Sequence, residues 1–176
     1  MCGINGIWNL DRTPVDPGEL DRFTDSLSHR GPDGRGIFLD QVHSIGLGHR
    51  RLAILDLSEA GRQPMSYADG RFTIVFNGEI YNFIEIRQKL EKRGFRFKSD
   101  SDTEVILAAY TQWGQKCQFE FNGMWAFAIW DSKEQTLFLS RDRFGVKPLF
   151  FLASERRLIF ASELKAFMAL SNQHRP

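Results

Sequence analysis

The chain has 176 residues, of which 42% are hydrophobic and 16 are Phe, so it can bury the core of one domain. Its 23 basic and 22 acidic side chains are spread along the sequence, with no basic arm, acidic tail or apolar run of about 20 residues, which argues against nucleic acid or a membrane as partner. Two cysteines, Cys2 and Cys117, are too few for a disulfide framework, and the N-terminus lacks signal-peptide character, so we expect a cytoplasmic protein.

The N-terminal part of the chain predicts a strand and a helix. Residues 2–9 are apolar but interrupted by small residues, as in a first strand. Asp16 is the expected N-cap of a helix, with Pro17 at the first position and Glu19 completing a capping box. The inner face of this helix is formed by Leu20, Phe23 and Leu27.

The middle of the chain predicts two strands followed by two helices. Residues 45–57 are strand-like, and residues 71–77 alternate apolar and polar side chains, as in a half-buried strand. One helix is expected from its cap Asn82 towards Gly94, and another from Ser101, where Ser-Asp-Thr-Glu is a second capping box. Their inward residues are Phe83, Ile86 and Leu90, and Val105, Ile106, Ala109, Tyr110 and Trp113.

The last part of the chain predicts more strands. Residues 124–130 are apolar without alternation, which is typical of a strand covered on both faces. Further strands at 136–140, 149–153 and 158–161 precede a short helix at 163–170. Groups of strands between pairs of helices predict an α+β layered fold, with helices covering the outside of packed sheets.

Cys2 is the first candidate for chemistry. Removal of Met1 would make Cys2 the N-terminal residue, with an α-amine whose usual pKa of about 7.7–8.0 lets it accept the thiol proton. Nucleophile and base would then belong to one residue. Judged alone, this position favours the other interpretation, a small residue after the initiator methionine that is packed or inert.

Asn77-Gly78 has two interpretations as well. Asn-Gly between apolar segments is the strongest short signal for a hairpin turn. The same pair at the end of a strand could direct the Asn side-chain N–H and the Gly backbone N–H at a developing oxyanion.

Three charged residues could bind a substrate, although each has an ordinary explanation. Arg51 could hold a carboxylate bidentately or lie on a solvated strand face. Asp102 could bind an ammonium group or complement a helix dipole, and Glu79 admits the same pair of interpretations. The four His residues and two cysteines lack metal-ligand spacing, so no metal site is expected.

Taken together, these residues resemble the class II, N-terminal-nucleophile glutamine amidotransferase domain of glutamine-hydrolysing asparagine synthetases. Six segments carry the resemblance, in the order of the family and over nearly the whole chain. They are Met-Cys-Gly-Ile at 1–4, Ser-His-Arg-Gly-Pro-Asp at 28–33, Gly-His-Arg-Arg-Leu-Ala-Ile-Leu-Asp at 48–56, Phe-Asn-Gly-Glu-Ile-Tyr-Asn at 76–82, Ser-Asp-Thr-Glu-Val-Ile at 101–106 and Arg-Asp-Arg-Phe-Gly-Val-Lys-Pro-Leu-Phe at 141–150.

The resemblance implies a fold and a set of roles. The fold would be a four-layer αββα sandwich of the N-terminal-nucleophile hydrolase type. The catalytic residues would be Cys2 as nucleophile, with its α-amine as base, and Asn77 and Gly78 as the oxyanion hole. The substrate-binding residues for L-glutamine would be Arg51 at the α-carboxylate and Glu79 and Asp102 at the α-ammonium. The segments at 29–33 and 141–150 identify the family but receive no chemical role.

The resemblance also implies a larger assembly. Residues 2–170 would be the glutaminase domain, and 171–176 the start of a linker to an absent C-terminal ATP-dependent synthetase domain or subunit. No cofactor is expected in this domain, and Mg-ATP only in the synthetase domain. Contacts with that domain predict an exposed hydrophobic patch along 144–151. A glutaminase domain with another ammonia acceptor, or a non-catalytic glutamine-binding module, are the alternatives.

Overall fold

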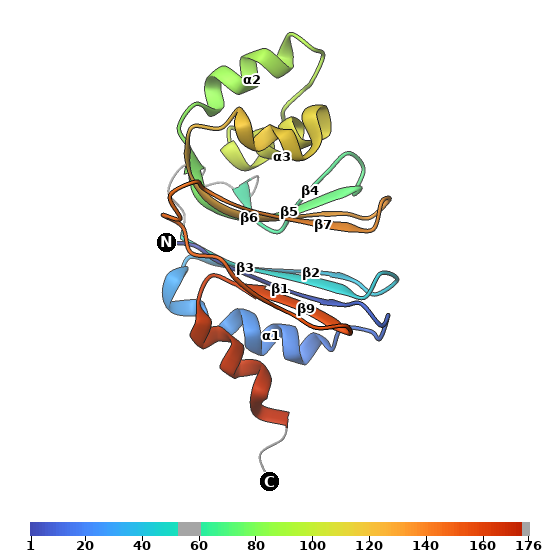
Figure 1. Ribbon diagram of the computed structural model, residues 1–176. Coiled ribbons are helices and arrows are strands. Elements are labelled where there is room, and N and C mark those ends of the chain that lie inside the picture. Colours follow the sequence, from blue (N-terminus) through green and yellow to red (C-terminus); the bar gives the residue numbers. More distant parts are fainter. Residues whose placement is uncertain (53–60, 174–176) are drawn as a thin grey trace.

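The computed structural model of the chain describes residues 1–52 and 61–173. Two antiparallel sheets lie face to face, and helices cover the outer face of each sheet (Figure 1). This is the four-layer αββα sandwich of the α+β class that we expected. None of the described helices is both long and apolar enough to cross a membrane.

The first sheet contains the N-terminal strand at its centre. Its order is β2-β3-β1-β9-β8, with all neighbours antiparallel. The strands are β1 (Gly3–Asn9), β2 (Gly34–Asp40), β3 (Ile45–Arg51), β8 (Phe150–Ala153) and β9 (Arg157–Ala161). The helix α1 (Pro17–Asp25) and the 3-10 helices η1 (Ser28–Arg30) and η4 (Leu164–Gln173) belong to this half. β2 was not expected, and residues 53–57 of the expected strand 45–57 lie outside the described residues.

The second sheet has the order β4-β5-β6-β7 and is also antiparallel. Its strands are β4 (Met65–Tyr67), β5 (Phe72–Ile80), β6 (Gly123–Asp131) and β7 (Thr136–Arg141). The helix α3 (Asp102–Trp113) covers its outer face, followed by the 3-10 helix η3 (Gly114–Phe119), and the helix α2 (Phe83–Glu91) packs against α3 on the side away from the sheet (Figure 1). The short β4 was not expected from the sequence.

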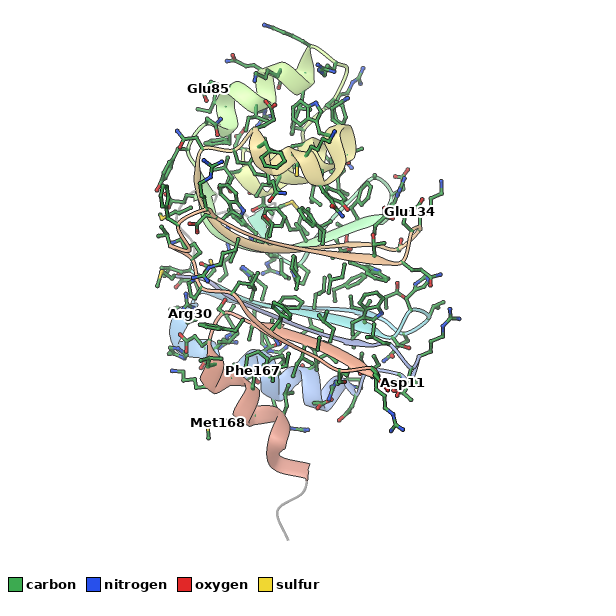
Figure 2. All side chains as sticks on the ribbon, in the orientation of Figure 1. Asp11, Arg30, Glu85, Glu134, Phe167 and Met168 are labelled. Atoms are coloured by element: carbon green, nitrogen blue, oxygen red, sulfur yellow. The ribbon has the colours of Figure 1, made fainter. Side chains whose placement is uncertain are left out.

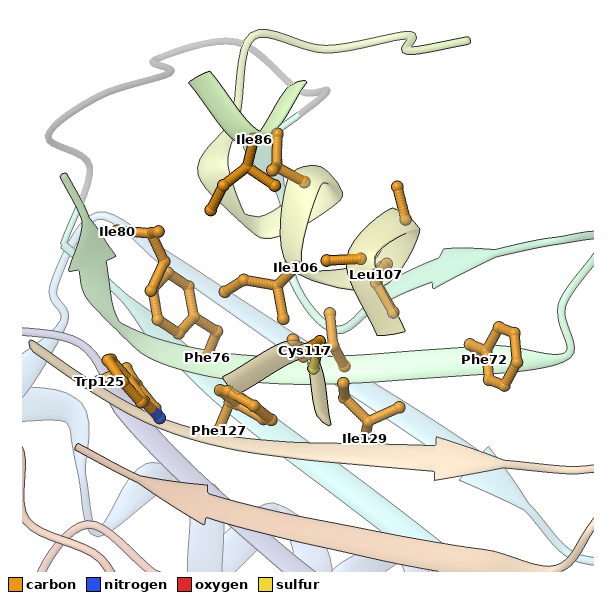
Figure 3. Packing of buried hydrophobic residues seen from close by; sticks show 14 of the residues in the cluster. Phe72, Phe76, Ile80, Ile86, Ile106, Leu107, Cys117, Trp125, Phe127 and Ile129 are labelled. Atoms are coloured by element: carbon orange, nitrogen blue, oxygen red, sulfur yellow. The ribbon is translucent and has the colours of Figure 1, made fainter. Parts of the chain in front are cut away.

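The buried apolar side chains form one cluster between each pair of layers. One cluster joins α1 and η4 to the first sheet, and a second fills the space between the sheets around Trp130 and Phe160. The third lies between the second sheet and its helices, where Phe76 and Phe127 pack beneath Ile106 of α3 (Figure 3). Leu20 and Phe23 of α1 are fully buried, as expected, and so is Leu27, which lies beyond the end of this helix.

β5 differs from the half-buried strand that its alternation predicted. Ile74 faces the helices, and Val75, on the opposite face, is also fully buried because the first sheet covers that face. Thr73 is buried there too, and its hydroxyl lies 3.1 Å from that of Ser66. A polar residue on the inner face of a sandwich thus gave the appearance of a solvent-facing side. β6 is buried on both faces, as expected.

The N-cap of α1 is confirmed, but the capping box is not formed. The Asp16 carboxylate accepts hydrogen bonds from Gly18 N (3.0 Å) and Glu19 N (3.2 Å). The Glu19 carboxylate binds the guanidinium of Arg157 on β9 instead of the backbone of Asp16. A charged partner far away in the sequence therefore displaces the local contact.

At the start of α3, the N-cap is likewise confirmed and the capping box is likewise not formed. Ser101 caps the helix by accepting from Thr103 N at 3.1 Å. Glu104, the expected second half of the box, instead accepts hydrogen bonds from the backbone N–H groups of Lys98 and Ser99. The preceding loop is thereby tied to the helix, which fixes the position of its first turn.

Ile74→Ala and Val75→Ala should both destabilise the chain, because the two side chains lie in different buried layers. We expect the free energy of unfolding to fall by about 2–5 kcal/mol for Ile74→Ala and about 2 kcal/mol for Val75→Ala in urea denaturation. Val42→Ala, at a position 83% exposed, is the control and should change it by less than about 0.5 kcal/mol. A negligible change in the free energy of unfolding for Val75→Ala would instead support a half-buried β5.

Candidate active site

The end of β5 has one uncovered edge. Its pairing with β4 stops at Ile74, opposite Met65, while its pairing with β6 continues to Ile80. Trp125 is the register partner of Gly78, yet it directs its own N–H and C=O to Asp142 on the other side of β6. The backbone N–H of Gly78 therefore points away from β6, towards the uncovered edge.

Side chains satisfy this edge on both sides of Gly78. Phe76 N donates to Oε1 of Gln63 at 2.6 Å, and Ile80 N donates to Oδ2 of Asp102 at 3.1 Å. Gly78 N lies between these two and has no hydrogen-bond partner among the described residues. One backbone donor is thus left open in a row whose neighbours are occupied.

The Asn77 side chain provides a second open donor. It extends from the other face of β5, into the space between the sheets, and is 1% exposed. Its Nδ2 has no hydrogen-bond partner within the described part of the chain. A buried donor without a partner is uncommon in folded proteins and calls for an explanation.

Asn77-Gly78 is not a hairpin turn. Both residues lie within β5, opposite Ala126 and Trp125 of β6. A Cβ added to Gly78 would lie 2.3 Å from the carbonyl oxygen of Met124, so only glycine fits without a shift of the strands. The absence of a side chain at Gly78 thus allows the close approach of β5 and β6.

Cys2 lies at the same end of the sandwich, directly before β1. Its thiol is half-buried, accepts from Leu52 N at 3.4 Å and donates to Leu52 O at 3.5 Å. The backbone is held as well, because Nε of Arg30 donates to Cys2 O at 2.9 Å. Figure 2 shows Arg30 at the end of the first sheet where Figure 1 places the N-terminus.

Arg30 was not expected to take part in the site. Its guanidinium is almost fully buried and pairs with Glu163 at 2.8 Å. Burial would raise the pKa of the Glu163 carboxyl, but hydrogen bonds from Arg30, His29 and Lys165 lower it to about 2. The only available signal for Arg30 was its place in the segment at 29–33.

An open pocket of about 610 Å³ brings the predicted residues together. All six line it: Cys2, Arg51, Asn77, Gly78, Glu79 and Asp102. Arg51 is supplied by the end of β3, and Asp102 by the first turn of α3. Residues without a predicted role also line it, among them Gln63, Thr103 and Lys147.

Two acidic groups in the pocket have raised pKa values. Burial raises the pKa of the Cys2 thiol, while the Leu52 N–H, the terminal ammonium, Arg51 and Lys147 act in the opposite direction. Burial also raises the pKa of the Asp102 carboxyl to about 6, against the hydrogen bonds from Ile80 and Thr103 and with a contribution from Glu79. Ionising either group without a nearby positive charge is costly, so a cationic neighbour would stabilise the charged form of both.

His49 supports the site from between the sheets. Burial lowers its pKa to about 4, so the imidazole is neutral at neutral pH. Its Nε2 lies 3.1 Å from Phe76 O and donates to it, which fixes the peptide directly before Asn77. Among the residues that the structure describes, no group of three or more His, Cys, Asp or Glu side chains could hold a metal ion.

Sequence comparisons find relatives along the entire described chain. The family profile described as "Glutamine amidotransferase domain" matches residues 1–175. "Putative asparagine synthetase [glutamine-hydrolyzing] 2" of Methanocaldococcus jannaschii is 45% identical over 97% of this chain and 35% of that protein. "Asparagine synthetase [glutamine-hydrolyzing] 3" of Bacillus subtilis is 44% identical over 96% and 28%, respectively. "Amidase chry2" of Gibberella zeae is 37% identical over 96% and 26%. The chain thus spans about a third of the length of these relatives or less.

A solved structure shares the fold. The glutamine phosphoribosylpyrophosphate amidotransferase of B. subtilis, complexed with ADP and GMP, superposes with a TM-score of 0.78 at 23% identity. The match covers 96% of this chain and 43% of that one. The layered arrangement of two sheets between helices is therefore common to both chains.

Cys2 should react with iodoacetamide in the folded protein, whereas Cys117 should not. Cys117 is 0% exposed, and burial raises its thiol pKa to about 12, so almost no thiolate is available at neutral pH. Mass spectrometry of peptides from briefly alkylated protein measures both sites. Modification of Cys117 before Cys2 would contradict this description of the pocket.

Proposed function

This chain belongs to the glutamine amidotransferase domain family, and on that premise we propose that it hydrolyses the side-chain amide of L-glutamine with Cys2 as the nucleophile. The active form would lack Met1, so that the Cys2 α-amine acts as the base. The observation that carries the proposal is the pair of open donors on β5. Among the residues that the structure describes, neither Asn77 Nδ2 nor the Gly78 N–H has a hydrogen-bond partner, and both residues line the pocket that also contains Cys2.

The acylation step uses these groups together. The α-amine takes the thiol proton, and the thiolate attacks the carboxamide carbon to form a C–S bond. The negative charge that develops on the amide oxygen would be held by Asn77 Nδ2 and Gly78 N. The C–N bond then breaks as the α-ammonium returns its proton to the nitrogen, and ammonia leaves.

Hydrolysis of the thioester completes the reaction. The neutral α-amine would remove a proton from water, whose oxygen attacks the thioester carbon and forms a second oxyanion in the same hole. Collapse of this intermediate breaks the C–S bond, regenerates Cys2 and releases glutamate. We propose that no cofactor takes part in this domain, since the protein supplies nucleophile, base and oxyanion donors.

The charged residues of the pocket suit the other end of glutamine. Arg51, at the end of β3, would bind the α-carboxylate bidentately. Asp102 and Glu79 would bind the α-ammonium, which supplies the cation that the buried Asp102 carboxylate lacks in the empty site. Fixing both α-substituents would direct the side-chain amide to the thiol.

We further propose that the ammonia serves a glutamine-dependent asparagine synthetase, with Mg-ATP bound in its synthetase domain. The names of the relatives support this partner, and so does the exposure of apolar side chains in the expected region. Phe144 is 89% and Phe151 62% exposed, so a second domain could cover them. The alternative is a different ammonia acceptor, because the G. zeae relative is named an amidase and not an asparagine synthetase. We also propose a cytoplasmic location, because a reducing compartment keeps the Cys2 thiol free.

Glutamate release from glutamine by Met1-free protein tests the proposal. Cys2→Ala should abolish it, and Asn77→Ala should lower kcat by about 10²–10³ through loss of one oxyanion donor. Asn122→Ala, which removes an exposed amide elsewhere, is the matched control and should leave kcat unchanged. Tight glutamine binding without turnover would favour the alternative of a non-catalytic module, and full activity in protein that retains Met1 would exclude the α-amine as base.

Glutamine affinity should depend on the ionisation of Asp102. The empty site has an Asp102 pKa of about 6, so the carboxyl is ionised at pH 7 and mostly protonated at pH 5. Calorimetry on the Cys2→Ala variant should show Kd rising about tenfold between pH 7 and pH 5, because a protonated carboxyl cannot pair with the ammonium. Asp102→Asn should bind weakly at both pH values, whereas Asp100→Asn, at an exposed neighbouring position, should behave like the parent. A Kd independent of pH in the parent would assign the ammonium to another group.

A further inference from the structure

The Arg141–Lys147 segment forms a turn built around one buried carboxylate. Asp142 is 6% exposed and lies directly after β7. Burial would raise its pKa, but backbone hydrogen bonds more than offset this and hold the pKa of the carboxyl below its usual 3.8. The donors, at 2.9–3.3 Å, are the N–H groups of Phe144, Val146, Lys147 and Trp125.

Arg141 fixes the other side of this turn. Its Nε donates to Lys147 O at 2.8 Å, and its Nη2 donates to Gly145 O at 2.6 Å. Gly145 adopts a φ of +65°, in the left-handed region that favours glycine. Together, Asp142 and Arg141 bind both backbone polar groups of Lys147, so this residue has a fixed place.

That place is the wall of the active-site pocket. Lys147 is 8% exposed and lines the pocket with Cys2. No carboxylate of the described residues forms an ion pair with it. A cationic side chain that is held in the pocket wall and has no paired carboxylate can attract an anion that forms in the pocket.

We propose that Lys147 supplies the standing positive charge that favours the thiolate of Cys2 and the oxyanions formed from it, and that the Arg141–Lys147 turn holds this charge in place. The inference rests on the proposed function, in which Cys2 is the nucleophile. Lys147 is then a positioning residue that acts through the electrostatic field at Cys2, since no hydrogen bond joins the two side chains.

The other cationic side chain of the pocket does not fill this role during the reaction. Arg51 also favours the thiolate in the empty site. In the proposed complex, however, the α-carboxylate of glutamine neutralises Arg51, so its net effect at the thiol largely disappears. Lys147 has no such counter-ion in the described chain, and its charge persists while the thiolate attacks.

Lys147→Met tests this, with Lys147→Arg as the charge-conserving variant and Lys133→Met as the control at an exposed turn. The rate of Cys2 alkylation is measured against pH in Met1-free protein, together with kcat/KM for glutamine hydrolysis and Tm. We expect Lys147→Met to raise the midpoint of the alkylation profile by about one pH unit, because an opposite charge near a thiol has an effect of this size. kcat/KM at pH 7 should fall about tenfold and recover towards the parent value at high pH. Lys147→Arg and Lys133→Met should retain the parent profile.

The readouts separate this inference from the proposed function. A parent protein without glutaminase activity would contradict the proposed function, although alkylation of Cys2 can still report the field of Lys147. An active parent whose alkylation midpoint does not move in Lys147→Met would overturn the inference. A uniform loss of activity at every pH, or an increase in KM alone, would also overturn it, by indicating a structural role or a direct contact with the substrate. If Lys147→Met lowers Tm strongly, Lys147→Gln gives the same comparison in a folded protein.

Discussion

The site depends on the way in which the backbone of β5 is held beyond the end of β4. A strand edge without a neighbouring strand would normally have its N–H groups in water. Here Gln63 and Asp102 bind the first and third of three successive edge donors, and His49 holds the intervening chain through Phe76 O. The donor of Gly78 is left open between them. Because donors on one edge of a strand recur at two-residue intervals, the occupied neighbours on both sides fix the position of the open donor.

The two sheets each contribute half of the pocket, which explains why it lies at one end of the sandwich. The first sheet supplies Cys2, directly before β1, and Arg51, at the end of β3. The second supplies Asn77 and Gly78 from the far part of β5. Antiparallel pairing of β1 with β3 brings the start of one strand beside the end of the other, so the two strands themselves place Cys2 near Arg51. Arg30 and Lys147 then approach Cys2 from the adjoining turns.

Much of this could be predicted from the sequence, and several of the exceptions depend on how distant segments pack. Helix starts at Asp16 and Ser101 follow from local chemistry, and they were predicted correctly. The partners of Glu19 and the burial of Val75 depend on segments distant in the sequence, and there the prediction was wrong. The six candidate site residues were predicted from the resemblance carried by six motifs in family order, and the fold brings all of them to one pocket. Lys147 could not be placed in this way, because its contact with the pocket depends on how the Asp142 turn closes over β6.

The two open donors on β5 also have a thermodynamic consequence for the protein at rest. Of the two, the Asn77 side chain is the buried one, and a buried donor without a partner costs a fold on the order of 1–3 kcal/mol relative to a satisfied one. The empty chain is therefore less stable than its core would allow, and the deficit is concentrated where the oxyanion would form. Selection for thermostability alone would favour an apolar side chain in place of Asn77, which under the proposed function would remove one oxyanion donor. Under the proposed function, this local loss of stability is the cost of keeping a donor available for catalysis.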